Sequence, residues 1–298
     1  MKKTSGIIIK VLIGLFLVVL ILFFTVPDKL KERIIKKVER IVNISTESNQ
    51  LATNAFPWPA GKRCAVSLTF DDAWISQVDK AIPLLDKYGV KATFYVLPDN
   101  LKKDLEDWKK AVKNGHDIGN HSILHPCSGN FQWSRQMGRA LEDYTTERMH
   151  AELDSANKVI KVLLGIVPVS FGYPCGQTFI GRGTNTLSYV PLISSMFETG
   201  RGYPDESTND PAFCDMAQLE GMPMDGKSFH EIKKLIESAK NQGSWLILVG
   251  HKINEGSNTD RLSTIKAICK YSMAPSNDIW IDNVHNIASF INSKRVKN

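Results

Sequence analysis

Two adjacent aspartates at the end of a predicted strand are candidate catalytic or metal-binding residues. Asp71 and Asp72 directly follow a run of β-type residues, 64–70. Consecutive side chains of a strand point to opposite sides, so neighbouring carboxylates at a strand end can do different jobs, one on a metal and one on a substrate or water. Adjacent acids at such a place also commonly cap a helix, so the pair alone does not define a site.

Two histidines have a spacing that suits a metal site. His121 and His125 are four residues apart, and imidazole is the commonest metal ligand in proteins. A Gly-Asn pair precedes them and a proline follows, which favours a loop or a single turn over a helix. With Asp72 they would supply three ligands and leave coordination positions open, which is typical of a catalytic metal site.

A further histidine, His251, ends the apolar run 245–250, where a buried core histidine is the favoured interpretation of this residue taken alone and a functional role is the alternative. All these side chains fall at the ends of predicted strands. In parallel α/β folds the chemistry lies at the carboxyl ends of the strands, so we expect the groups to converge.

The elements that must position these groups alternate between β-type and helical runs. We expect strands at 64–70, 92–97, 116–119, 169–173, 245–249 and 279–281, and helices at 76–88, 101–114, 140–164, 229–242, 261–271 and 284–291. Such alternation predicts parallel strands covered by helices, in an open doubly wound sheet or a barrel. A single unit of about 235 residues without an internal repeat favours the barrel.

From about residue 62 to 291 the sequence resembles the NodB-type polysaccharide deacetylases, also called carbohydrate esterase family 4. Four ordered motifs carry the resemblance: Thr-Phe-Asp-Asp at 69–72, His-Ser-x-x-His at 121–125, Tyr-Pro-Cys-Gly at 173–176 and Leu-x-x-His at 248–251. The resemblance implies an α/β fold, a distorted (β/α) barrel of about seven strands. It also implies a hydrolase that removes N- or O-linked acetyl groups from an acetylated glycan.

The resemblance further implies a role for each motif residue. Asp71 would be the general base and His251 the general acid. One divalent metal, usually zinc with cobalt, manganese and nickel as alternatives, would be held by Asp72, His121 and His125. A backbone N–H at Cys175 would help to bind the oxyanion, and Tyr173 beside it would contact the substrate.

The sequence departs from the family pattern in two places. The third motif usually begins with an arginine, and here Gly172 stands in that position, so no cation from there can hold the base. The aspartate that orients the acid histidine has two candidates, Asp215 and Asp225, which the sequence does not separate.

The five cysteines are odd in number and lack Cys-x-x-Cys spacing, which excludes a zinc ribbon. Cys127 and Cys175 lie in candidate site loops and could pair outside the cytoplasm, but buried free thiols are an equal alternative, and the state of Cys214 is open. A stacking platform for a sugar could be formed by Trp133, Tyr173, Phe179 and Tyr203, or these rings could belong to the core.

The N-terminal region predicts a membrane anchor. Residues 7–26 are apolar except for Lys10, and twenty helical residues span about 30 Å, the thickness of the hydrocarbon core. A cleaved signal peptide is the alternative, although no small-x-small site follows. We therefore expect a cytoplasmic tip with an anchor or signal segment (1–26), a basic juxtamembrane stretch and linker (27–60) and a catalytic domain (61–298).

This anchor predicts a catalytic domain outside the cytoplasm, periplasmic or extracellular, or secreted if the segment is cleaved. The count of positive charges after residue 26 opposes export, unless the basic stretch is an amphipathic helix on anionic lipid.

The distribution of charge excludes nucleic-acid binding. Residues 1–60 hold 9 Lys and Arg against 4 Asp and Glu, whereas residues 61–298 hold 28 against 27, so the body has no basic surface for phosphates. Two further functions compete with deacetylation, namely a cyclic amide hydrolase resembling allantoinase or imidase and a non-catalytic glycan-binding protein. The glycan, the native metal, protein partners and oligomeric state are not determined by the sequence.

Overall fold

The computed structural model describes residues 56–254 and 260–295. The predicted anchor at residues 7–26, and with it most of the juxtamembrane stretch, lies outside these residues. Among the described helices, none combines the length and the apolar character that crossing a membrane requires.

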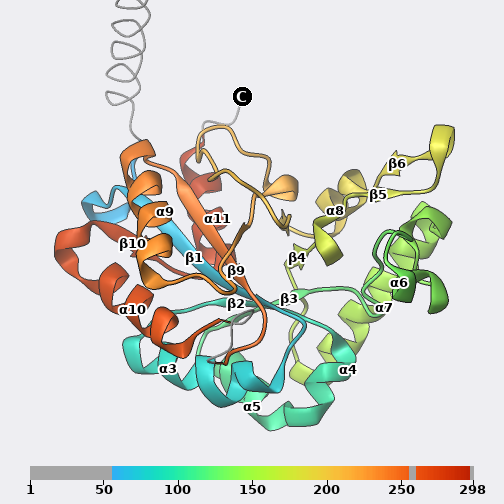
Figure 1. Cartoon of the computed structure of the whole chain (residues 1–298), viewed down its shortest axis with the longest axis horizontal. Coiled ribbons are helices and arrows are strands. Elements are labelled where there is room, and N and C mark those ends of the chain that lie inside the picture. The colour runs from blue at the N-terminus through green and yellow to red at the C-terminus, as the bar shows by residue number, and fades with distance from the viewer. Residues whose placement is uncertain (1–55, 255–259, 296–298) are drawn as a thin grey trace, which may run out of the picture. The chain divides into compact units, whose positions relative to one another are not determined.

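A parallel sheet forms the centre of the fold (Figure 1). Strand β1 (Cys64–Asp71) is buried at every residue, as expected for a central parallel strand covered on both faces. The sheet runs in the order β7-β4-β3-β2-β1-β9-β8. Strand β10 also pairs with β1, along residues 64–66, whereas β2 pairs with residues 69–71 of β1. The other strands are β2 (Thr93–Val96), β3 (Asp117–Asn120), β4 (Ser170–Gly172), β7 (Thr199–Arg201), β8 (Met222–Pro223), β9 (Trp245–Gly250) and β10 (Ile279–Ile281).

The two edges of this sheet are joined through Leu219, just before β8. The N–H of Gly202 donates to the carbonyl of Leu219 over 2.7 Å, and the N–H of Leu219 donates to the carbonyl of Gly200 over 2.8 Å. These bonds link β7 to the segment that leads into β8, so seven of the eight strands curl round as an irregular half-barrel, with β10 outside that series. The predicted parallel (β/α) fold of about seven strands is confirmed, whereas the membrane helix predicted before it lies outside the described residues.

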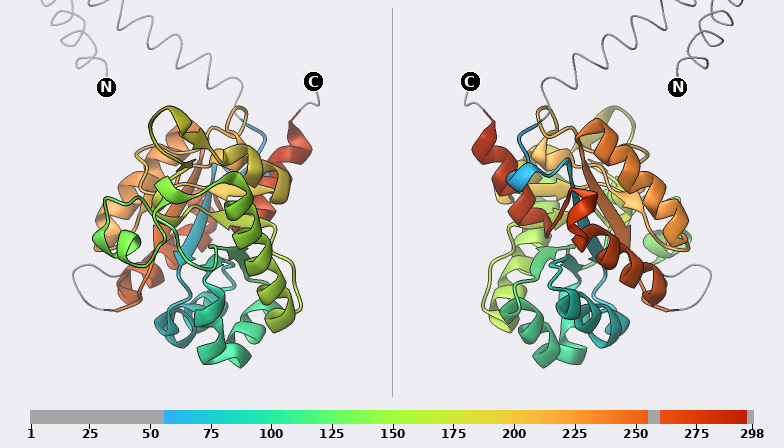
Figure 2. Two further views of the ribbon diagram at one scale, coloured as in Figure 1. Left: turned by 90° about the vertical axis from the view of Figure 1, so that its right-hand side faces the viewer. Right: turned by 90° about the vertical axis from the view of Figure 1, so that its left-hand side faces the viewer.

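Helices cover the outside of the sheet, as the two side views in Figure 2 show. Helices α9, α10 and α11 are coloured orange to red in its right-hand view, and the light green α7 faces the viewer in the left-hand one. The helices are α3 (Ile82–Tyr88), α4 (Pro98–Leu101), α5 (Leu105–Lys113), α6 (Gln132–Gln136), α7 (Thr146–Leu164), α8 (Val190–Met196), α9 (Phe229–Gln242), α10 (Leu262–Met273) and α11 (Val284–Lys294). A small antiparallel pair, β5 (Phe179–Ile180) and β6 (Leu187–Ser188), stands apart from the sheet.

Local signals set where the helices begin and end. Helix α9 starts at a capping box in which Ser228 and Glu231 satisfy each other's backbone N–H, and it ends at the left-handed Gly243. The predicted helix 140–164 is shorter than expected, because the hydroxyl of Thr145 accepts from the N–H of Arg148 and starts α7 there. Residues 141–143 form a separate 3₁₀ turn.

Trp58, placed by the sequence in the linker, packs against the body. Its side chain is 5% exposed, its Nε1–H donates to the carbonyl of Gly243 over 2.9 Å, and its ring stacks on Phe290. The boundary between linker and catalytic domain at residue 60 stays a prediction, but this contact ties residues before it to the fold.

Candidate active site

The predicted site residues lie on loops at the carboxyl ends of β1, β3 and β9. Asp71 is the last residue of β1, and Asp72 follows it with φ 74°. His125 lies in the loop after β3 with φ 52°, so a loop carries the histidines, as predicted. Left-handed backbone at non-glycine residues costs energy and commonly marks sites where geometry is imposed by function.

Asp72, His121 and His125 converge on a common point. Oδ1 of Asp72 lies 3.7 Å from Nε2 of His121 and 3.6 Å from Nε2 of His125, and the three ligand atoms lie within 4.8 Å of one another. These separations exceed hydrogen-bond lengths, yet they suit three donors placed about 2.0–2.2 Å from one zinc ion. The donor set therefore fits a divalent metal.

The two imidazoles are prepared as neutral ligands. Burial lowers the pKa of His121 and that of His125 to about 4, so both rings are unprotonated at neutral pH. Nδ1 of His121 donates to the carbonyl of Gly172 over 2.8 Å, which leaves the Nε2 lone pair free for a metal. The indole N–H of Trp74 donates to Oδ2 of Asp72 over 3.1 Å and orients that carboxylate.

Asp71 is ionised through a buried arginine. It is 3% exposed, and Nη2 of Arg201, itself fully buried, donates to Oδ1 of Asp71 over 2.5 Å. Burial acts to raise the pKa of Asp71, but the positive charges of Arg201 and His251 and the hydrogen bond from Arg201 outweigh it and lower the pKa. Burial and the charge of Asp71 raise the pKa of Asp72 instead. Two adjacent carboxyl groups whose pKa values are shifted in opposite directions suit different chemical roles.

Arg201 supplies the cation beside the base that position 172 does not supply. Position 172 does carry no charge, but Arg201 on β7 is the register partner of Gly172 on β4 and reaches the same carboxylate. No motif in the sequence marks this arginine, because it lies in a short run, Thr-Gly-Arg, that no periodicity distinguishes.

His251 faces Asp71 across the site. Its Nε2 lies 3.9 Å from Oδ2 of Asp71, and its Nδ1–H donates to Oδ2 of Asp225 over 2.5 Å. Burial acts to lower the pKa of His251, but the Asp225 hydrogen bond and the carboxylates around it raise the pKa to about 9. Between the two candidates for the orienting aspartate, the structure selects Asp225, because Asp215 caps the 3₁₀ turn Met216–Gln218 instead.

A buried amide holds the two strand ends together. Nε2 of Gln77 donates to the carbonyl of Asp71 over 2.7 Å and to that of His251 over 2.9 Å. The sequence did not single out Gln77, which lies in a helical run without a motif. Its double hydrogen bond fixes the spacing between the carboxylate on β1 and the imidazole after β9.

The third-motif residues divide between the site and the core. Cys175 has φ 55° and forms a disulfide with Cys127, whose Sγ lies 3.5 Å from Nδ1 of His125; Cys214 is a free thiol. The expectation of a substrate contact at Tyr173 is not met by its side chain, which is 1% exposed and donates its hydroxyl to the carbonyl of Ala217. The aromatic ring of Tyr173 belongs to a core cluster.

Two of the four predicted stacking rings lie beside the site. Trp133 is 38% exposed with its ring centroid 6.2 Å from that of His125, and the ring of Tyr203 lies 5.5 Å from that of His251. Phe179, like Tyr173, packs into a core cluster.

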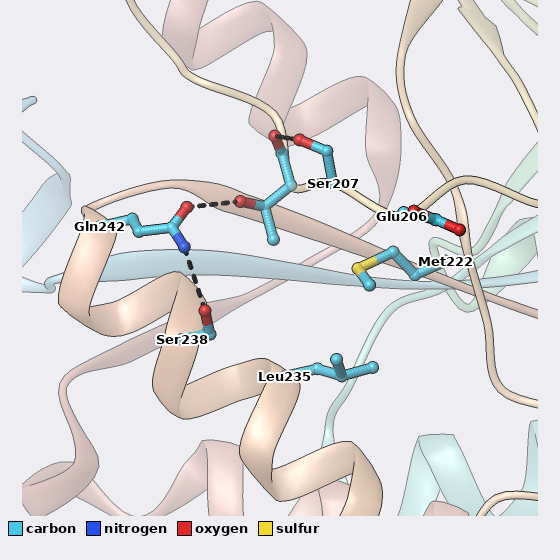
Figure 3. A pocket seen from close by; sticks show the side chains of 7 residues that line it. Glu206, Ser207, Met222, Leu235, Ser238 and Gln242 are labelled. Atoms are coloured by element: carbon cyan, nitrogen blue, oxygen red, sulfur yellow. Dashed lines mark hydrogen bonds between the residues drawn. The ribbon is translucent and has the colours of Figure 1, made fainter.

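A hollow between α9, β8 and the segment 206–208 lies apart from these groups (Figure 3). Gln242 joins Thr208 and Ser238 by hydrogen bonds across its wall. Glu206 is its one ionisable lining residue, so it has no set of acids and bases for hydrolysis.

Comparisons with known proteins agree with this geometry. Residues 59–187 match the family model for polysaccharide deacetylase, a span that contains Asp71, Asp72, both ligand histidines and Cys175. Over this span the chain is similar to the polysaccharide deacetylase family. The resemblance inferred from the four motifs is therefore confirmed.

Relatives within the polysaccharide deacetylase family match only part of the chain. A peptidoglycan-N-acetylglucosamine deacetylase of Bacillus cereus is 40% identical over 73 residues, which are 24% of this chain and 26% of the relative. The chain spans about a third or less of the length of the first curated relatives it matches, at 31%, 8% and 26%.

Solved structures show the same fold at low identity. A probable polysaccharide deacetylase from Pseudomonas aeruginosa PAO1 superposes with a TM-score of 0.58 at 12% identity, over 81% of this chain and 95% of that chain. An allantoinase structure superposes with the same TM-score at 14% identity, over 81% and 94%. The fold alone therefore does not separate deacetylases from cyclic amide hydrolases.

Proposed function

We propose that the protein is a metal-dependent hydrolase that removes N- or O-linked acetyl groups from a polysaccharide or oligosaccharide. The observation that carries the proposal is the approach of His251 to Asp71, the neighbour of the ligand Asp72, with Nε2 of His251 3.9 Å from Oδ2 of Asp71. One is an ionised acceptor and the other a protonated donor, which are the two groups that hydrolysis of an acetyl bond needs. The similarity of residues 59–187 to the polysaccharide deacetylase family supports this assignment.

The divalent metal would be held by Asp72, His121 and His125. When bound, it supplies a Lewis acid that polarises the acetyl carbonyl and makes water more acidic. Asp71 takes a proton from the water whose oxygen forms the new bond to the carbonyl carbon. Arg201 keeps that carboxylate ionised and fixes its direction, because its guanidinium holds Oδ1 and leaves Oδ2 toward His251.

His251 completes the reaction as general acid. Its proton passes from Nε2 to the amine or alcohol as the bond to the acetyl carbon breaks, so that acetate and a free amine or hydroxyl are left. Asp225 holds Nδ1–H and stabilises the charged ring before transfer. The backbone N–H at Cys175, in a loop held by the disulfide, is proposed to support the oxyanion.

The alternative on the same fold, opening of a cyclic amide, uses similar groups. Exposed indoles at Trp74 and Trp133 beside the ligands favour a large substrate with flat faces, such as a sugar, over a small metabolite. A non-catalytic glycan-binding role is disfavoured, because binding alone needs neither the Arg201–Asp71 nor the His251–Asp225 pair.

Acetate release tests the proposal. The full chain, stripped of metal and then titrated with Zn²⁺, Co²⁺, Mn²⁺ or Ni²⁺, is incubated with acetylated chito-oligosaccharides, acetylated xylan and allantoin. Metal-dependent acetate release from a glycan is expected, and it should vanish in His121→Ala together with the bound metal. Ring opening of allantoin without acetate release from any glycan would reject the proposal in favour of the alternative.

We further propose that the N-terminal segment anchors the enzyme to a membrane, with the catalytic body outside the cytoplasm. The support is the apolar run at residues 7–26 and the polymeric nature of the proposed substrate. Membrane sedimentation that resists carbonate extraction is expected. A soluble protein with a new N-terminus near Pro27 would indicate cleavage instead.

A further inference from the structure

We propose that Asp260 is a positioning residue whose neutral carboxyl donates a hydrogen bond to Asp225 and thereby holds the carboxylate that orients His251. This inference deepens the proposed function, since it extends the chain of groups behind the general acid from Asp225 to a second aspartate. Neither a motif in the sequence nor the family pattern marks Asp260.

Backbone pairing brings Asp260 to the end of β9. Its N–H donates to the carbonyl of Lys252 and its carbonyl accepts from the N–H of Asn254, both over 2.9 Å. The carboxyl group then lies against Gly250, the residue before His251. A Cβ added to Gly250 would fall 1.7 Å from Oδ2 of Asp260 and 2.6 Å from its Cγ. Only glycine at position 250 therefore allows this approach.

The carboxyl group of Asp260 is buried, and neither of its oxygens accepts a hydrogen bond from a described donor by distance and angle. The residue is 1% exposed. An ionised carboxylate in that position would be unfavourable, because burial removes its hydration and the backbone N–H of His251, which also donates to Asp225 over 3.2 Å, offsets only part of that loss. Burial, followed by the charge of Asp225, raises the pKa of Asp260 well above its usual range.

Asp225 can accept a hydrogen bond from the buried carboxyl group of Asp260 if Asp260 is protonated. Two carboxylates cannot hydrogen-bond to each other, but a protonated Asp260 can donate its O–H to Asp225, the side chain it interacts with. Asp225 already accepts the ring N–H of His251 over 2.5 Å and the backbone N–H of His251 over 3.2 Å. A further donor would fix its rotamer and withdraw part of its negative charge from His251.

The charged and titratable groups that act on His251 come from several elements. Asp71 and Asp72 lie at the end of β1, Asp225 follows β8, and Asp260 precedes α10. The ring of Tyr203 packs edge-on against His251. Because all four carboxyls affect His251, the pKa of this imidazole reports whether Asp260 is neutral or ionised.

Nuclear magnetic resonance of the full chain, labelled with ¹³C at the histidine ε1 carbon, measures that pKa with and without added Zn²⁺. The His251 signal is assigned by its absence from His251→Ala. In Asp260→Asn the amide still donates to Asp225, so the pKa of His251 should stay as in the unmodified chain. In Asp260→Leu the donor is lost, Asp225 recovers its full charge, and the pKa of His251 should rise.

Other changes in the pKa of His251 in these two variants would overturn the proposal. If Asp260 were ionised, Asp260→Asn would remove a nearby negative charge and lower the pKa of His251 by about 1–3 units. An unchanged or lowered value in Asp260→Leu would show that Asp260 does not act on Asp225. Asp215→Asn, which alters an aspartate outside the network, is the matched control and should leave His251 unchanged.

Infrared spectroscopy gives an independent measurement if Asp260→Leu does not fold. The C=O stretch of a protonated carboxyl should be present in the unmodified chain at pH 7 and missing from Asp260→Asn, and its absence from the difference spectrum would reject the neutral carboxyl. None of these measurements depends on turnover. Failure of the deacetylase proposal would therefore appear in acetate release, while failure of this inference would appear in the His251 pKa.

Discussion

Gly172 and Arg201 are register partners on the neighbouring strands β4 and β7, and the guanidinium of Arg201 uses the space beside the glycine. A Cβ at position 172 would lie 3.0 Å from Nη2 of Arg201 and 2.8 Å from Cγ of Tyr95. The same Nη2 lies 2.5 Å from Oδ1 of Asp71. The positive charge that the family motif supplies from position 172 is here supplied by the strand beside it.

Arg201→Met should therefore raise the pKa of Asp71 and move the acidic limb of the activity profile to higher pH. The lowered pKa of Asp71 means that the pair stabilises the fold above the unfolded pKa and that this stability is lost as pH falls. Leaving the buried carboxylate unpaired should lower the unfolding free energy by about 3–5 kcal/mol at pH 7. Arg201→Lys retains the charge and should recover part of both losses. An acidic limb that does not move in Arg201→Met would remove Arg201 from the site.

Asp225→Asn should lower the pKa of His251, because the carboxylate that holds Nδ1–H is replaced by a neutral amide. In the metal-free chain the pKa of His251 is raised to about 9, so its stabilisation is complete below its unfolded pKa and is lost as pH rises through about 9. The basic limb of activity should move to lower pH in this variant. Asp215→Asn serves as control, and equal shifts in both variants would contradict the assignment of Asp225.

The disulfide between Cys127 and Cys175 should contribute measurably to stability. It closes a loop with a sequence separation of 48 residues, for which chain entropy predicts about 4 kcal/mol, with measured values usually about 2–4. The double variant Cys127→Ser/Cys175→Ser should therefore unfold at lower urea concentration. Cys214→Ser, which changes a free thiol, should unfold close to the unmodified chain. Identical midpoints for the two variants and the unmodified chain would show that the bond does not constrain the unfolded state.

Trp58→Ala should destabilise the catalytic body by about 3–5 kcal/mol, the usual cost of truncating a buried tryptophan. Trp58→Phe keeps an aromatic ring against Phe290 but loses the hydrogen bond to Gly243, and it should cost only about 1 kcal/mol. Urea unfolding of both variants measures the difference. If Trp58→Ala unfolds at the same urea concentration as the unmodified chain, Trp58 does not stabilise the catalytic body, and the predicted domain boundary at residue 60 stands.

The three residues that the sequence predicts as metal ligands lie together in the structure, because their spacing and their places after strands carry that information. Asp72, His121 and His125 each follow a short apolar or extended run, and parallel strands bring such ends to one edge of the sheet. Arg201 and Gln77 were missed because each acts across strands, through a register that only the folded sheet defines. Trp58 was assigned to a linker because its neighbours are polar and proline-rich, and long-range packing on Phe290 overrode that local signal.

The choice between Asp215 and Asp225 shows the same limit. Both are single acids in irregular segments, and local sequence gives neither a distinguishing pattern. Asp215 accepts from the N–H of Ala217 two residues on, whereas Asp225 reaches a histidine 26 residues away. Only the pairing of β8 with β9 brings Asp225 to His251.

Metal analysis and acetate release in Asp71→Asn and Asp72→Asn, each followed across a metal titration, test the central claim most directly. Asp72→Asn exchanges an anionic ligand for a weaker amide oxygen, so bound metal and activity should fall together and excess metal should restore both in part. Asp71→Asn keeps the ligand set, so metal should remain bound while turnover falls by about 10² to 10⁴, with no rescue by metal. Metal rescue of Asp71→Asn, or normal metal binding by an inactive Asp72→Asn, would contradict the assignment of base and ligand.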